Sequence, residues 1–259
     1  MRRRIVYTPR FVMSLSSRRI AALTCITYIV GLSPAWPQDV FNQKRAFDAK
    51  TVTPLVAIRE IGLQSHAPIG IVFGANQSAL CTGRVSFALH EVTPRDALEE
   101  AVRSANYSVE EHDGIILLMA PDVNSHQQML LAHRFKEFRT EAKQTMHGIS
   151  AQLTGWLWVE VDGAQGYGES IGDSTTAHTI NLPVLEDVTT EQIADRIVKI
   201  PPAGMWILQG NTIPPLLPAT EGSTTPSASD SARDTIDFYS WSEPDQVRRE
   251  LICPKSDGQ

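Results

Sequence analysis

The chain has 259 residues, of which 42% are hydrophobic and 20% are charged. This ordinary globular composition leaves room for one large or two small domains. The first 35 residues hold six arginines and no acidic residue, so the rest of the chain has 17 basic and 29 acidic residues, a net charge of −12. Such a surface repels phosphate backbones and anionic lipids, which argues against nucleic acid as a partner.

The N-terminus has the three regions of a secretory signal in order. Arginines come first, an apolar run follows over 20–32, and Ser33-Pro34-Ala35 supplies the small residues of a cleavage site. The apolar run is shorter than the roughly 20 residues of a membrane span. We therefore expect 1–35 to be a signal peptide and the exported chain to begin at Trp36. The periplasm is the expected location, with secretion or outer-membrane association left open. Arg18-Arg19 leaves a twin-arginine route open beside the Sec route, although paired arginines are common in ordinary signals.

The next region, 42–122, predicts a small α+β module. Thr53-Pro54 caps a first helix, and Thr93-Pro94 caps a second one after an alternating strand. We expect Asp113-Gly114 to form the turn of a closing hairpin. The other expected elements are a possible strand near Phe47, a strand over 68–73, the alternating strand over 84–91, and inward helix residues Ala97, Leu98, Ala101 and Val102.

A second region, 129–210, repeats this order of elements. "VSFALHEVTPRDALEEAV" begins at Val85, and "INLPVLEDVTTEQIADRIV" begins at Ile180. Both run from a strand through Val-Thr into an amphipathic helix, which favours a tandem duplication of one β-α-β type module over a chance match. The expected elements are a helix over about 129–153 and strands over 156–161, 179–186 and 204–209, with a helix over 190–198.

The segment 211–259 is rich in Pro, Ser and Thr, and we expect most of it to be a disordered tail. Its aromatic residues either dock on the chain's own domain or contact a partner. The Gly-rich loop over 162–178 would display the aromatic side chain of Tyr167. Trp156 and Trp158 either pack in the core or form an exposed binding face. The candidate partner contacts are Tyr167, Phe238, Tyr239 and Trp241.

The segment from Phe47 to Pro121 resembles the short N-terminal (STN) domain of secretins and TonB-dependent receptors. The resemblance lies in the apolar helix before "IGIVF", in "VSFAL", in the junction "EVTPRDALEEAV", and in the hairpin "YSVEEHDGIILL". It implies a periplasmic module in which two helices pack against small sheets and which works by contacts with envelope proteins. It implies no catalytic residue. The chain departs from the family in having no outer-membrane barrel after the module, which leaves transport and secretion themselves unsupported.

Motifs for catalysis or metal binding are missing from the sequence. There is no HExxH, CxxC or GxSxG, and the seven histidines are scattered. We therefore predict no catalytic residue, cofactor, metal or small-molecule substrate. We predict instead that the chain is a non-catalytic interaction protein of the cell envelope. The alternative is an exported hydrolase that works through the loop before His178. Cys81 and Cys253 are a possible disulfide pair, since exported cysteines can be oxidised.

Overall fold

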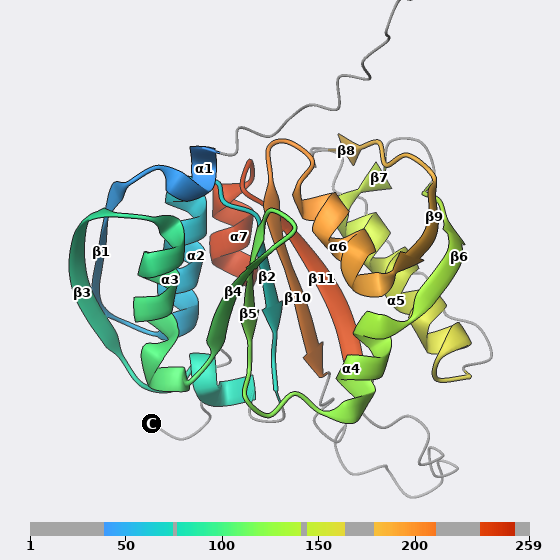
Figure 1. The fold of residues 1–259 in the computed structure, drawn as a ribbon, viewed down its shortest axis with the longest axis horizontal. Helices are drawn as coiled ribbons and strands as arrows, with labels where there is room; N and C mark the ends of the chain where they lie inside the picture. The colour runs from blue at the N-terminus through green and yellow to red at the C-terminus, as the bar shows by residue number, and fades with distance from the viewer. Residues whose placement is uncertain (1–38, 75–76, 141–143, 164–178, 211–233, 252–259) are drawn as a thin grey trace, which may run out of the picture. The chain divides into compact units, whose positions relative to one another are not determined.

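The computed structural model describes residues 39–74, 77–140, 144–163, 179–210 and 234–251, which belong to one compact unit, Trp36–Gln259. The predicted α+β class is confirmed by a mixed sheet with helices (Figure 1). None of the described helices has the length and apolar character needed to cross a bilayer. The predicted signal peptide lies outside the described residues.

The described elements follow one another in chain order. They are α1 (Asp39–Asn42), β1 (Arg45–Val52), α2 (Pro54–Ser65), β2 (Ile69–Val72), η1 (Gln77–Leu80), β3 (Val85–Val92), α3 (Pro94–Val102), η2 (Arg103–Ala105), β4 (Ser108–His112), β5 (Ile115–Met119), α4 (Ser125–Ala132), β6 (Arg134–Phe138), β7 (Gln144–Thr145), α5 (Met146–Glu160), β8 (Thr179–Ile180), β9 (Leu185–Thr189), α6 (Thr190–Val198), β10 (Gly204–Gly210), β11 (Asp234–Ser240) and α7 (Pro244–Glu250).

A five-stranded sheet in the order β11-β10-β2-β5-β4 forms the centre of the unit. The three inner strands are parallel to one another, and each outer strand is antiparallel to its neighbour. The inner strands read "IGIV", "IILLM" and "GMWILQG". Such nearly continuous apolar runs are typical of strands that are buried on both faces, because successive side chains point to opposite sides of a sheet.

Each face of the sheet carries its own hydrophobic core. Ile71, Leu118 and Ile207 pack with α2, α3 and α7 on one face. Leu117, Trp206 and Leu208 pack with α5 and α6 on the other. Two antiparallel pairs lie beyond these helices, β1–β3 on the first side and β6–β9 on the second (Figure 1). The unit is thus layered strand, helix, sheet, helix, strand.

The two strand-to-helix junctions picked out in the sequence have closely similar geometry. Thr93 and Thr189 both cap nine-residue helices through a capping box, in which the N3 side chain bonds back to the cap N–H. Each junction is preceded by a left-handed residue, Glu91 with φ 56° and Asp187 with φ 50°. This likeness favours the duplication, which stays a prediction.

The second region departs from the predicted elements at its start. The helix expected over about 129–153 is wrong, because Ser125–Ala132 forms α4 and Arg134–Phe138 forms strand β6. Residues 146–160 then form one helix, α5, which also replaces the strand expected over 156–161. The aromatic and β-branched letters "WLWV" favour a strand locally. In the structure Ser150 and Thr154 both donate hydrogen bonds to the carbonyl of Ile236, which hold this segment as a helix over β11. Tertiary contacts therefore override the local preference.

The C-terminal segment is also organised differently from the expectation. Asp234–Ser240 forms β11, which pairs with β10 along its whole length, and Pro244–Glu250 forms α7. The expected tail thus completes the sheet, while 211–233 and 252–259 lie outside the described residues. The two predicted modules also share one sheet, because β10 from the second pairs with β2 from the first.

Candidate functional site

Strand β4 forms one edge of the central sheet and is the more exposed of its two edge strands. Four of its five residues are exposed, and Val109 is half-buried. At the opposite edge, every residue of β11 is buried or half-buried. Among the described residues β4 pairs only with β5, so one side of its backbone has no strand partner. Free N–H and C=O groups of this kind are a template for a further strand.

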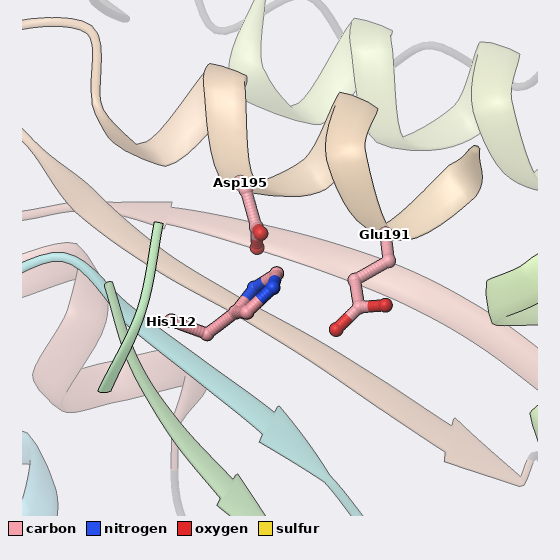
Figure 2. A group of neighbouring side chains, drawn as sticks. All are labelled: His112, Glu191 and Asp195. Atoms are coloured by element: carbon pink, nitrogen blue, oxygen red, sulfur yellow. The ribbon is translucent and has the colours of Figure 1, made fainter. Parts of the chain in front are cut away.

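His112, the last residue of β4, lies beside two carboxylates on α6. Glu191 and Asp195 are four residues apart, so they share one face of the helix. One ligand atom from each of the three side chains lies within 4.8 Å of the others. Figure 2 shows the imidazole ring between the two carboxylates. The group joins the hairpin of the first region to a helix of the second.

Asp195 is held in place by the buried indole of Trp206. The Trp206 Nε1–H donates a hydrogen bond of 2.9 Å to Asp195 Oδ1. Trp206 lies opposite Gly70 on the neighbouring strand β2, where a Cβ atom would come within 2.6 Å of the indole ring. The absence of a side chain at Gly70 therefore leaves the room in which the indole lies. Asp195 itself is only 2% exposed.

Burial changes the acidity of this carboxyl group. Loss of solvation raises the pKa of Asp195 to about 6, and the nearby Glu191 acts in the same direction, while the Trp206 hydrogen bond opposes them. Lys199 is close enough to favour the ionised form, although its Nζ donates to the Asp113 carbonyl at 2.7 Å. The site thus joins a desolvated carboxylate, a half-buried carboxylate and an exposed imidazole.

A second histidine, His126, bridges two carboxylates in another part of the unit. Its Nδ1 lies 2.6 Å from Asp234 Oδ2, and its Nε2 lies 2.8 Å from Asp162 Oδ1. Both ring nitrogens can donate only when the ring is protonated. The two carboxylates accordingly raise the pKa of His126, although partial burial opposes this shift. The bridge connects α4, the turn that follows α5, and the start of β11.

This bridge predicts a pH-dependent contribution to stability. Because the pKa of His126 is raised in the folded state, the contribution is complete below the unfolded value near 6.5 and is lost as the pH rises through the folded pKa. The side chain is 38% exposed, so solvent screening limits the effect to about 1 kcal/mol or less. Thermal unfolding of the parent protein and of His126→Gln, measured from pH 5.5 to 8.5, checks this expectation.

The difference in melting temperature between parent and His126→Gln should shrink as the pH rises. His90→Gln is the matched control, because His90 is exposed on β3. A difference that stays constant or grows with pH would show that the bridge does not act through a protonated ring.

The predicted partner contacts are not gathered at one place. Tyr167 lies outside the described residues. Phe238 and Trp241 are buried, in the cores on opposite faces of the sheet, and Tyr239 is half-buried against the first core. The Trp241 Nε1–H donates to the Ala67 carbonyl at 2.8 Å. These three aromatics therefore dock on the chain's own domain, which is one of the two alternatives expected for them, and Phe238 and Trp241 leave little surface for a partner.

Sequence reasoning missed the His112 cluster because its members are far apart in the chain. The only local signal is the four-residue spacing of Glu191 and Asp195, which is common on solvated helices. The expected core role of Trp156 fits the structure, since its ring lies 5.3 Å from that of Phe138. Cys81 forms a disulfide bond, but Cys253 lies outside the described residues, so their pairing stays a prediction.

Comparison of the chain with protein-family models, with curated proteins and with solved structures gave no match.

Proposed function

We propose that this chain is an exported interaction protein of the cell envelope that binds an extended segment of a partner protein along β4. The observation that carries the proposal is the exposed edge of the central sheet at Ser108–His112. Addition of a strand to such an edge gives affinity through backbone hydrogen bonds, and side chains of the edge strand give specificity.

The register of the β4–β5 hairpin determines which backbone groups of β4 can bond to an added strand. His112 pairs with Ile115 on either side of the two-residue turn Asp113-Gly114. Residues that flank a two-residue turn exchange both of their hydrogen bonds, and the pattern alternates along an antiparallel pair. His112, Glu110 and Ser108 thus bond to β5. Val109 and Glu111 direct their N–H and C=O groups outward, where an incoming strand would meet them.

The negative charge of β4 indicates which side chains the partner segment should carry. Glu110 and Glu111 are adjacent exposed residues of β4, so each face of the strand presents one carboxylate. A second copy of β4 would set like charges opposite each other, which is destabilising. A segment with Lys or Arg at alternate positions would instead form cross-strand pairs. The favoured occupant is therefore an extended basic segment of another protein.

The arrangement of the first region supports the envelope role. The pair β1–β3, the helices α2 and α3 and the strands β2, β5 and β4 form two helices between two small sheets. That arrangement is what the STN resemblance implies, and STN modules act by contacts with envelope proteins. The Arg-rich start and the apolar run over 20–32 support export.

Glu111→Pro tests the strand-addition route. Proline removes the outward N–H at this position and leaves the groups that bond to β5 in place. We expect a loss of about tenfold in the amount of partner recovered by affinity capture from envelope extract, because the backbone hydrogen bond donated by this N–H is lost. Thermal melting of the variant checks that the hairpin is intact.

Two further variants test whether capture depends on the charge at β4 or on the acidic charge of the surface as a whole. Glu111→Lys should weaken capture, whereas Asp48→Lys makes the same change at an exposed residue of β1 and should not. The proposal fails if a folded Glu111→Pro protein recovers the same partners in the same amounts as the parent.

A further inference from the structure

We propose that His112, Glu191 and Asp195 bind one divalent transition-metal ion of the Zn²⁺ type. Such a site would take a small ligand and is independent of the partner at β4. An imidazole and two carboxylates from two different regions of the chain lie together there (Figure 2).

The distances allow the three side chains to share an ion after a small adjustment. Their ligand atoms lie within 4.8 Å of one another. Metal–ligand distances of about 2.0–2.2 Å place tetrahedral donors about 3.4 Å apart, so the group must contract by about 1–1.5 Å. The His112 side chain is 53% exposed and Glu191 is half-buried, so both can rotate. Asp195 can stay fixed as the anchor.

The donor set selects the kind of ion. Imidazole nitrogen is a common ligand of Zn²⁺ and of other divalent transition metals, whereas Mg²⁺ and Ca²⁺ prefer sites made of oxygen alone. The two carboxylates supply the negative charge that offsets that of a dication. Three protein ligands leave one position to solvent on the exposed side of His112.

The setting of Asp195 is the observation that points to a ligand. Among the described residues, this carboxylate has a single hydrogen bond, from Trp206 to Oδ1, and no salt bridge. The group is directed at His112 (Figure 2). With Oδ1 bonded to the indole, the carboxylate keeps further lone pairs that can bind an ion. A hydrogen bond from a buried indole also orients a ligating carboxylate in the way that outer partners do at metal sites.

If Asp195 served only to hold Trp206 in place, neither its charge nor the two neighbouring side chains would be needed. To accept the bond from Trp206, one side-chain oxygen is sufficient, and an asparagine in place of Asp195 provides it at nearly the same size. Neither His112 nor Glu191 takes part in that bond. The structural role therefore predicts that Asp195→Asn is silent or stabilising and changes no property that depends on metal.

A bound metal ion would link the β4–β5 hairpin to α6, because its ligands come from both. The hairpin turn already meets this helix region through the Lys199 contact to Asp113. A metal ion adds a second link close to the end of the exposed edge strand. Binding to the folded chain alone stabilises it by mass action, so the melting temperature should rise with metal concentration.

The test titrates Zn²⁺ into the full chain, purified from its host without a polyhistidine tag and treated with chelator. Calorimetry should give one ion per chain, and Co²⁺ should give visible absorption bands. His112→Ala should lower Zn²⁺ affinity at least about tenfold, as should Glu191→Gln, because each removes a ligand. Mg²⁺ and Ca²⁺ should give no comparable signal.

Two control variants distinguish binding at this site from binding at other histidines and from a loss of folding. His90→Ala removes an exposed histidine on β3 and should leave the affinity unchanged. Asp195→Asn should melt at or above the parent temperature without metal and should lose most of the Zn²⁺-induced rise. Absence of Zn²⁺ binding by the folded parent would overturn the proposal, and so would equal binding by parent and His112→Ala. Neither result bears on the partner at β4.

Discussion

Leu98→Asp should unfold the protein or leave it with little stability. Leu98 is fully buried on α3, in the core between that helix and the central sheet. An unpaired carboxylate there cannot be solvated, and the apolar contacts of the leucine are lost as well. We expect a loss of about 4 kcal/mol or more in the free energy of unfolding, against a typical total of about 5–15 kcal/mol. Chemical denaturation followed by circular dichroism measures this loss.

Two variants on the same helix define the expected pattern. Val102→Asp should behave like Leu98→Asp, because Val102 is 1% exposed and lies in the same core. Arg95→Ala should change stability by less than about 0.5 kcal/mol, because its salt bridge to Glu99 is exposed. Equal stability of Leu98→Asp and the parent would mean that this face of α3 is not in the core.

Trp241→Ala should destabilise the protein by about 3–5 kcal/mol, a loss typical of a buried Trp truncated to Ala. The indole is 2% exposed and fills the space beside Gly62, where a Cβ atom would come within 2.4 Å of the ring. Truncation leaves a cavity and removes the donor to the Ala67 carbonyl. For a unit of this size, the melting temperature should fall by about 10 °C or more.

Trp241→Phe separates the cavity from the hydrogen bond. It keeps most of the ring contacts and loses the N–H donor, so the loss should be clearly smaller than for Trp241→Ala. If Trp241→Ala melts at the parent temperature, the segment after 233 does not belong to the core.

Local signals predicted the first region well, because each depended on residues close together in the chain. Thr53 and Thr93 cap their helices in the structure as expected from the Thr-Pro pairs. Asp113-Gly114 turns the hairpin with positive φ at both residues, the conformation that this pair favours. Leu98 and Val102 are buried, as their helical spacing indicates.

Long-range pairing limited the rest of the prediction. The apolar residues of β11 resembled a short cluster in a loose tail, because the strand with which they pair ends at Gly210, more than 20 residues earlier. No local pattern shows that β10 joins β2 across the two predicted modules. The His112 cluster depends on that junction, since its residues come from both sides of it.

The measurement that tests the interaction account most directly is site-specific photo-crosslinking in intact cells. A photoreactive residue at position 111 samples the outer side of β4, and one at the exposed position 48 on β1 serves as the control. The account predicts an adduct at 111 that is absent at 48, with the crosslinked partner peptide mapped by mass spectrometry to one extended segment rich in Lys or Arg. Equal labelling at both positions, or no adduct at 111, would contradict binding along β4.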